Sequence, residues 1–203
     1  MVYPIFLNLT GRSVAVVGDG RVAYRKIVGL LEAGASITVI SPQLSSELEI
    51  LEKEKRLIWK KKYFSAEDIE GAFLIIAATD SREANLQVKQ AGGKHQIVNI
   101  VDNSIEADFH IPAVMKRGKL TIAVSTSGAS PILAKKIRSS LEQSYDERFE
   151  DNLEFLHRCR MEILAEVQDP VRKRQLLEAV AEETFFTDPN REENFQKLLK
   201  FNE

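Results

Sequence analysis

Apolar positions in the first hundred residues follow two alternating patterns. Short, continuous apolar runs occur at residues 13–17, 36–40, 73–78 and 97–101, and such runs are typical of parallel strands buried on both faces. Between the first two runs the apolar residues recur every three to four positions, which predicts a helix that starts near Arg21 and stops at Gly34. The buried positions expected on this helix are Val22, Ala23, Ile27, Leu30 and Leu31.

Further elements follow the same logic. We expect a helix at residues 44–54, a strand at 57–60, and a helix from the N-cap Ser81 to residue 91. The pattern then changes, because residues 109–114 and 120–125 form a hairpin-like pair in which Pro112 favours an edge strand. Ser130 and Pro131 start a helix that runs to about residue 142. The remaining sequence predicts three charged helices at residues 148–167, 170–183 and 192–199.

These elements predict an α/β fold with a Rossmann-like parallel sheet, followed by a short segment and a small all-helical C-terminal domain. We place the sheet domain at residues 1–113, the connecting segment at 114–144 and the helical domain at 145–203.

The turn after the first strand carries the clearest chemical signal. Its G-x-G-x-x-A pattern consists of Gly18, Gly20 and Ala23. In a dinucleotide-binding turn the first glycine allows the tight turn, the second lets a pyrophosphate approach the backbone, and the small third residue lets helix and strand pack closely. The pyrophosphate rests on the free N–H groups of the helix N-terminus. A plain βα turn is the alternative, but its place in the first βαβ unit favours a nucleotide site.

Residues after the other strands refine this prediction. An acid that binds the adenosine ribose is expected after the second strand, yet the chain has Ser41, Pro42 and Gln43 there. Ser41 and Gln43 are candidates for hydrogen bonds to ribose hydroxyls. Because this segment has no Arg or Lys to neutralise a 2′-phosphate, NAD is favoured over NADP. Ala78 and Thr79 end the fourth strand and are expected beside the cofactor.

Asp102 follows the fifth strand and is expected to face the same cleft. Two interpretations of this carboxylate remain open from the residues alone. It either takes part in the chemistry of the cleft or caps the turn that follows.

Composition limits the classes of function. The 203 residues carry 28 Lys and Arg against 30 Asp and Glu, a formal charge of -2, which does not favour nucleic-acid binding. Cys159 is the only cysteine and the three histidines are scattered, so neither an internal disulfide nor a metal site is predicted. The N-terminus does not resemble a signal peptide and no apolar run reaches membrane length. We expect a cytoplasmic protein.

Several motifs occur together in an order that resembles the precorrin-2 dehydrogenase family of sirohaem biosynthesis. They are Pro4-Ile5-Phe6, Gly18-Asp19-Gly20-Arg21-Val22-Ala23, Ala77-Ala78-Thr79-Asp80, Asn99-Ile100-Val101-Asp102, Phe109-His110-Ile111-Pro112 and Ser125-Thr126-Ser127-Gly128-Ala129-Ser130-Pro131. The chain is also similar to the dehydrogenase part of sirohaem synthases, without their methyltransferase domain. The resemblance implies NAD-dependent oxidation of precorrin-2 to sirohydrochlorin and a homodimer built through residues 114–144.

The resemblance also implies roles for individual residues. Arg21, Val22, Pro42 and Gln43 match the family's nucleotide contacts, and Asp102 matches its cleft aspartate, as a general base or as a group that orients the substrate. Candidates for binding the carboxylates and the ring of precorrin-2 are His110, Lys116, Arg117, Lys119 and the backbone amides of Ser127 and Gly128. For the basic turn, a solvated hairpin is the alternative.

Two other functions stay open at this point. A bifunctional enzyme would also insert metal into sirohydrochlorin, whereas a purely oxidising enzyme would pass its product to a separate chelatase. The third possibility is a non-catalytic regulator that senses NAD, which the net charge and the lack of a basic recognition helix disfavour.

Overall fold

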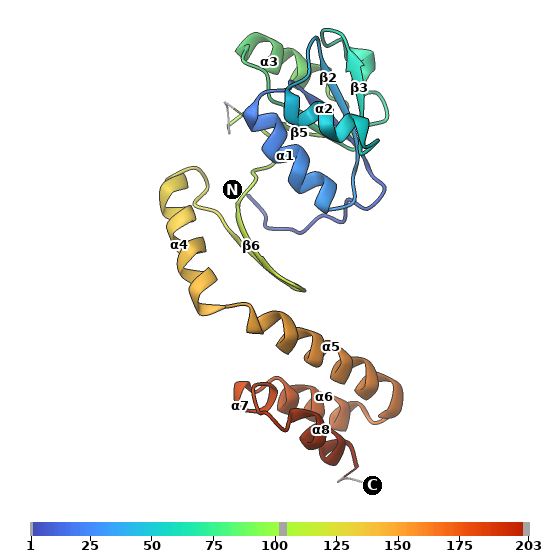
Figure 1. Cartoon of the computed structure of the whole chain (residues 1–203), viewed down its shortest axis with the longest axis vertical. Helices are drawn as coiled ribbons and strands as arrows, with labels where there is room; N and C mark the ends of the chain where they lie inside the picture. Colours follow the sequence, from blue (N-terminus) through green and yellow to red (C-terminus); the bar gives the residue numbers. More distant parts are fainter. Residues whose placement is uncertain (1, 102–104, 201–203) are drawn as a thin grey trace. The chain divides into compact units, whose positions relative to one another are not determined.

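The computed structural model describes residues 2–101 and 105–200 (Figure 1). The chain divides into two compact units, Met1–Ile111 and Pro112–Glu203. The boundary predicted after residue 113 lies close to this division, and the further separation of residues 114–144 from 145–203 stays a prediction.

The first unit is built on a five-stranded parallel sheet. Its strands are β1 (Ser13–Val17), β2 (Ser36–Ser41), β3 (Leu57–Lys61), β4 (Leu74–Ala77) and β5 (Ile97–Ile100), in the order β3-β2-β1-β4-β5. All four strand pairs are parallel. The chain runs from β1 outward through β2 to β3 on one side of β1. It then crosses to the other side of β1 and continues through β4 to β5. The direction in which strands are added therefore reverses beside β1. The predicted Rossmann-like α/β class is confirmed.

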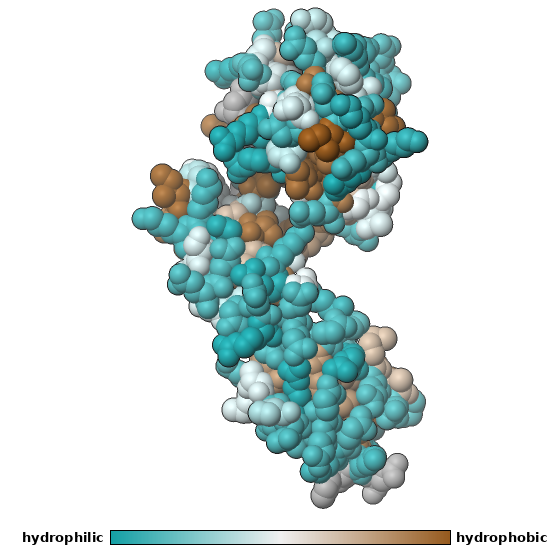
Figure 2. Space-filling view, in the orientation of Figure 1, coloured by the Kyte–Doolittle hydropathy of each residue, from teal (hydrophilic) through white to brown (hydrophobic). Residues whose placement is uncertain are grey.

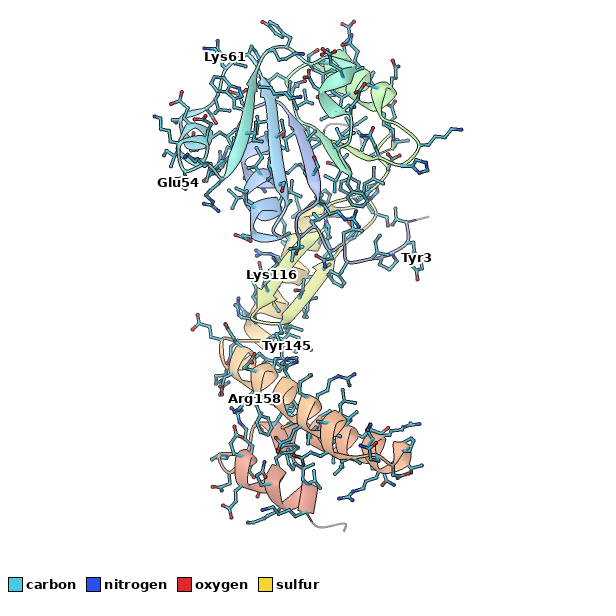
Figure 3. All side chains as sticks on the ribbon, turned by 90° about the vertical axis from the view of Figure 1, so that its right-hand side faces the viewer. Tyr3, Glu54, Lys61, Lys116, Tyr145 and Arg158 are labelled. Carbon is cyan, nitrogen blue, oxygen red and sulfur yellow. The ribbon has the colours of Figure 1, made fainter. Side chains whose placement is uncertain are left out.

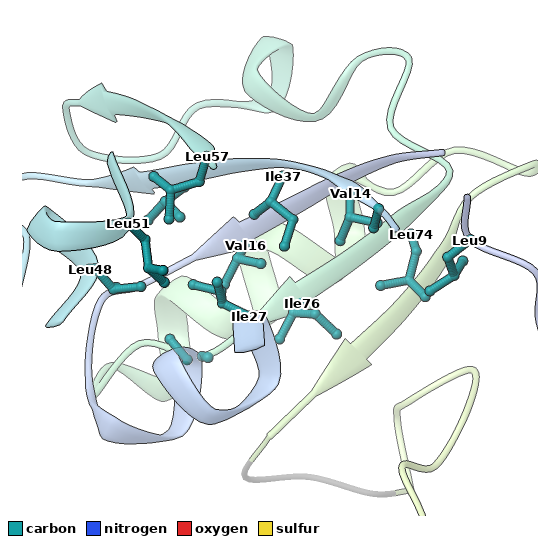
Figure 4. Close-up of a cluster of buried hydrophobic side chains, with 14 residues drawn as sticks. Leu9, Val14, Val16, Ile27, Ile37, Leu48, Leu51, Leu57, Leu74 and Ile76 are labelled. Atoms are coloured by element: carbon teal, nitrogen blue, oxygen red, sulfur yellow. The ribbon is translucent and has the colours of Figure 1, made fainter. Parts of the chain in front are cut away.

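Both faces of the sheet are covered, as the continuous apolar strands predict. On one face Val14, Val16 and Ile76 pack against α1 (Arg21–Glu32) and α2 (Ser46–Lys53) (Figure 4). On the other face, Ala15, Val17 and Ile75 pack against α3 (Arg82–Ala91) and the 3₁₀-helix η1 (Ala66–Ile69). The side chains of consecutive strand residues therefore point to opposite faces of the sheet and pack in different helix layers.

The helix boundaries match the sequence signals closely, with one error in the core. Gly34, with φ of 76°, follows the end of α1 as predicted. Ala23 and Ile27 are fully buried, and Leu30 and Leu31 pack against the same core. Val22 was predicted to be buried, but 48% of its surface is exposed. It lies about 100° around the helix from Ala23, in the first turn, where the sheet ends.

The second unit contains the antiparallel hairpin of β6 (Ala113–Arg117) and β7 (Leu120–Val124), followed by α4 (Pro131–Ser144). The first hairpin strand was predicted four residues too early. Residues 108 and 109 are hydrogen-bonded to β5 instead of lying in the hairpin. The Asp108 N–H donates to the Val98 carbonyl at 2.8 Å, and Asn99 Nδ2 donates to the Phe109 carbonyl at 2.8 Å. Pro112 therefore precedes the strand instead of lying within it.

The helical end of the second unit has its own core. It consists of α5 (Arg148–Glu166), α6 (Pro170–Val180), α7 (Glu183–Phe186) and α8 (Arg191–Lys200) around Phe155, Ile163 and Phe195. The helix predicted at residues 170–183 is thus two helices, α6 and α7. In the part of the chain that the structure describes, no helix is both long and apolar enough to cross a membrane.

A buried carboxylate joins η1 to the edge strand β3. The Asp68 side chain is 4% exposed and lies 3.3 Å from Lys60 Nζ and 3.1 Å from Lys62 Nζ. It also accepts hydrogen bonds from the backbone N–H and the hydroxyl of Ser65. Burial raises the pKa of Asp68, but the hydrogen bonds from Ser65, Lys62 and Lys60 outweigh it and hold the pKa at about 2, below the ordinary 3.8.

This network makes stability dependent on acid pH. At pH 7, Asp68→Asn is expected to lower the free energy of unfolding of the first unit by about 1–3 kcal/mol, because charged hydrogen bonds are lost. Since the folded-state pKa lies below the unfolded value, the contribution is complete above the unfolded pKa and is lost as the pH falls toward about 2. Urea unfolding of both proteins should show their difference shrinking over that window.

The control is Glu67→Gln, because the Glu67 side chain is 74% exposed where it meets Lys62. This change should alter stability by less than about 1 kcal/mol. A difference between wild type and Asp68→Asn that stays constant down to the acid limit would contradict the assignment.

Candidate functional site

The carboxyl ends of β1, β2 and β4 meet around Gly18. Its backbone has φ of 111°, and a Cβ added there would lie 2.3 Å from the Ala78 carbonyl oxygen and 3.0 Å from the Thr79 nitrogen. The Gly18 N–H also donates to the Ile40 carbonyl at 2.9 Å. Only glycine combines this backbone conformation with this approach, so the predicted tight turn at Gly18 has a direct steric cause.

The helix that follows this turn has an open N-terminus. The N-cap Gly20 supplies no side-chain hydrogen bond, and the first turn of α1 contains no acid. Every other helix among the described residues has a capping side chain or an acid in its first turn. A Cβ at Gly20 would meet no atom within 4 Å. The N–H groups of Arg21, Val22 and Ala23 thus begin a helix that can receive an anion.

On the β2 side, a tryptophan fixes the strand end. Trp59 Nε1 donates to the Ser41 carbonyl at 3.0 Å and to Ser41 Oγ at 3.2 Å, and Ser41 Oγ donates to the Gln43 carbonyl. Ser41 is 2% exposed. Its hydroxyl is therefore engaged inside the fold and shapes the turn, which leaves Pro42 and Gln43 as the exposed candidates in this segment.

A cation that the local sequence did not reveal lies on the neighbouring strand. The parallel register pairs Ser41 with Lys61 of β3, whose Nζ lies 5.5 Å from the centre of the Trp59 ring (Figure 3). The segment after β2 has no Lys or Arg of its own. In the sequence the lysines after Trp59 are interpreted as a solvated strand end rather than a phosphate clamp, and that this strand pairs with β2 beside Ser41 is known only from the register.

On the β4 side, an asparagine fixes the strand end. Asn85 of α3 is fully buried. Its Oδ1 accepts from the Thr79 N–H at 3.0 Å and from the Thr79 hydroxyl at 2.8 Å, and its Nδ2 donates to the Thr79 carbonyl at 3.1 Å. Ala78 is buried, whereas Thr79 is half-buried. Sequence reasoning did not single out Asn85, although a polar residue four positions after the N-cap Ser81 was a visible signal.

Asp102, the predicted catalytic residue, lies outside the described residues. The last residue of β5 is Ile100. The assignment of Asp102 as the catalytic residue rests on its position in the sequence and on the family resemblance.

The predicted substrate-binding residues divide between the two units. His110 belongs to the first unit, whereas Lys116 and Arg117 belong to β6 in the second. Arg117 is half-buried, and its Nη1 donates to the Lys116 carbonyl at 3.0 Å. Lys119 forms an ion pair with Glu154 of α5 at 3.1 Å. Arg117 and Lys119 therefore have contacts inside the second unit, and Lys116 is exposed.

The loop before α4 is partly closed by its own hydrogen bonds. The Ser127 N–H donates to Ser125 Oγ at 3.1 Å, and Ser130 Oγ accepts from the Leu133 N–H at 3.2 Å as the predicted N-cap. Ser127 and Gly128 both have positive φ, 50° and 88°. The Ser127 amide and the Leu133 N–H therefore already have acceptors within the loop, and the Gly128 amide stays a candidate for anion binding.

Metal-ligating side chains do not gather in the described ranges. No group of three or more His, Cys, Asp or Glu residues in residues 2–101 and 105–200 is placed to hold a metal ion. Burial raises the pKa of the Cys159 thiol to about 11, which keeps it protonated at neutral pH.

Comparisons with known proteins agree with this geometry. The family described as "Putative NAD(P)-binding" matches residues 5–113, and "Sirohaem biosynthesis protein central" matches residues 117–144. Precorrin-2 dehydrogenase of Priestia megaterium is 38% identical over 90% of this chain and 91% of its own. Siroheme synthase of Neisseria meningitidis serogroup C is 40% identical over 87% of this chain but only 37% of its own.

A solved structure extends the similarity to the whole fold. The structure titled "SirC, precorrin-2 dehydrogenase" superposes with a TM-score of 0.86 at 36% identity, over 98% of this chain and all of that one. The turn at Gly18, the uncapped start of α1 and these matches lead to one conclusion: the chain belongs to the precorrin-2 dehydrogenase family.

Proposed function

We propose that this protein oxidises precorrin-2 to sirohydrochlorin with a nicotinamide cofactor. The observation that carries the proposal is the uncapped N-terminus of α1 above the turn at Gly18, in a chain that belongs to this family. The reaction removes two hydrogens from precorrin-2, one as a hydride and one as a proton. The bound cofactor supplies the hydride acceptor, and the protein holds it and receives the proton.

The residues of the first unit fit a dinucleotide. Gly18 and Gly20 add no side chain on either side of Asp19, and the first N–H groups of α1 have no capping side chain, so they are proposed to bind the pyrophosphate. Pro42 and Gln43 are proposed to contact the adenosine ribose, and Ala78 and Thr79 to line the opposite side. We propose NAD as the cofactor because residues 42–45 contain no Arg or Lys and the neighbouring Lys61 has its Nζ over the Trp59 ring.

Asp102 is proposed to act on the substrate. A carboxylate two residues beyond β5 follows a strand whose carboxyl end belongs to the same edge as Gly18. Its role is that of a general base for the proton, or of a group that orients the pyrrole nitrogens.

The second unit is proposed to form a homodimer. The first half of α4 exposes Ile132 at 70%, Leu133 at 49% and Ile137 at 39%, and Val114 of β6 is 38% exposed. Figure 2 shows hydrophobic surface over the first turns of α4. Leu133 and Ile137 are four residues apart and share a helix face. A second copy of the chain is the proposed partner for these side chains.

The first prediction for this function concerns the cofactor. Gly20→Ala is expected to leave the melting temperature nearly unchanged, since its Cβ meets no atom within 4 Å, but to raise the Kd for NADH about tenfold or more by obstructing the pyrophosphate. NADH fluorescence measures the Kd, and NADPH titrated in parallel tests the preference for NAD.

The matched control is Gly29→Ala in the same helix, where an added Cβ also meets nothing within 4 Å. It should stabilise the protein by up to about 1 kcal/mol through helix propensity and leave NADH binding unchanged. Equal NADH affinity in Gly20→Ala and wild type would contradict the proposed position of the pyrophosphate.

The second prediction concerns Asp102. In an anaerobic assay that follows NADH formation from precorrin-2 and NAD, Asp102→Asn should lower kcat by about 10²–10⁴-fold if Asp102 is the base. NADH affinity and the melting temperature should be unchanged. Near-normal turnover would remove Asp102 from the mechanism.

Adding Co²⁺ to the accumulated product and recording its absorbance tests metal insertion separately.

The third prediction concerns assembly. Ile137→Glu is expected to convert a dimer into a monomer in sedimentation analysis, because a charge would be buried in the proposed interface. Met161→Glu on α5, where Met161 is 56% exposed, is the control and should leave the dimer intact. A wild-type monomer at micromolar concentration would argue against the dimer.

A further inference from the structure

The peptide that joins Ala78 to Thr79 forms one wall of the turn at Gly18. The Ala78 N–H donates to the Val17 carbonyl at 2.8 Å, and the Ala78 carbonyl and Thr79 nitrogen are the atoms that leave no room for a side chain on Gly18. β4 ends at Ala77, so the sheet does not continue to hold Thr79. Another group has to fix this peptide for the turn to keep its shape.

Asn85 supplies that group. Its carboxamide accepts from the Thr79 N–H and donates to the Thr79 carbonyl, so it pairs with the backbone of one residue as a neighbouring strand would. Asn85 lies in the first turns of α3 and is fully buried, which restricts its side chain to this one arrangement. Ser81 also links the two segments, because its N–H donates to Thr79 Oγ1 at 3.2 Å and its carbonyl accepts from the Asn85 N–H at 3.0 Å.

We propose that Asn85 is a positioning residue for the dinucleotide: by holding the Thr79 backbone against Gly18, it sets the shape of the turn that receives the pyrophosphate. The inference rests on the proposed function. Asn85 itself is buried beneath Thr79 and acts through it. Without the carboxamide, the Thr79 peptide is free to rotate, and the wall against which Gly18 packs is no longer fixed.

A purely structural role is the competing explanation, and the chain contains a matched control for it. Gln96 is another carboxamide with three hydrogen bonds, all of them to the main chain, whereas those of Asn85 described above are two to the main chain and one to the Thr79 hydroxyl. Its Oε1 accepts from the Gly93 N–H at 2.8 Å, and its Nε2 donates to the Ile69 and Ala72 carbonyls at 2.6 and 2.8 Å. It precedes β5 and therefore belongs to the amino edge of the sheet, opposite the edge that carries Gly18.

The experiment compares Asn85→Ala with Gln96→Ala in the full-length protein. Both should lower the melting temperature by similar amounts, because each loses three hydrogen bonds. At a temperature where circular dichroism shows both to be folded, Asn85→Ala should raise the Kd for NADH about tenfold and Gln96→Ala less than about twofold. In the oxidation assay the KM for NAD should rise in Asn85→Ala while the KM for precorrin-2 stays near the wild-type value.

A second pair of variants keeps the test valid if Asn85→Ala does not fold. Asn85→Asp retains the shape and the acceptor but loses the donor to the Thr79 carbonyl, and protonation of the new carboxyl restores that donor. NADH affinity of Asn85→Asp should therefore recover toward wild type as the pH is lowered from about 8 to about 5. The Gln96→Glu variant and the wild type should show no such recovery.

The outcomes distinguish a failure of the positioning role of Asn85 from a failure of the proposed function. If wild type binds NADH and Asn85→Ala binds it equally well, or if Gln96→Ala weakens binding as much as Asn85→Ala does, the positioning role is wrong and the proposed function stands. If wild type binds neither NADH nor NADPH, the proposed function fails and the positioning role fails with it.

Discussion

The first unit depends on one close approach between two backbones. Gly18 at the end of β1 packs against the Ala78–Thr79 peptide at the end of β4, where a Cβ would lie 2.3 Å from a carbonyl oxygen. Because β1 is the central strand and its Gly18 N–H also bonds to Ile40 of β2, three strand ends are fixed at one point. The start of α1, three residues later, takes its position from this point.

A half-buried tryptophan and a buried asparagine hold that point from either side. Trp59 bonds to Ser41 at the end of β2, and Asn85 bonds to Thr79 after the end of β4. Trp59 donates to the last residue of β2, whereas Asn85 pairs with the Thr79 backbone beyond the last residue of β4, where the sheet supplies no partner. A binding site formed in this way is rigid before its ligand arrives, which lowers the entropy cost of binding.

The sequence predicted the parts of this unit that depend on local patterns. Continuous apolar runs located β1, β2, β4 and β5, and Gly34, Ser81 and Ser130 marked helix ends correctly. Failures occurred where a contact distant in sequence decides the outcome. Residues 108–109 pair with β5, which displaced β6, and only the parallel register shows that Lys61 lies on the strand beside Ser41. The hydrogen bond from Trp59, 18 residues away, to the Ser41 hydroxyl was likewise not visible in the sequence.

The missing cap of α1 locates the anion site better than the glycine pattern does. Glycine-rich turns between a strand and a helix also occur where no nucleotide binds, so the spacing of Gly18, Gly20 and Ala23 identifies a turn and not a ligand. Elsewhere this chain supplies caps where they are needed: Ser81, Ser130 and Asp169 each accept a hydrogen bond from the first turn of their helix. At α1 neither the N-cap nor the first turn supplies a capping side chain or an acid, and the adjacent acid, Asp19, precedes the N-cap Gly20. A phosphate would supply the acceptor that these N–H groups lack. If a dinucleotide binds as proposed, it supplies the acceptors that this helix start lacks, and its binding stabilises the folded first unit through the same few N–H groups.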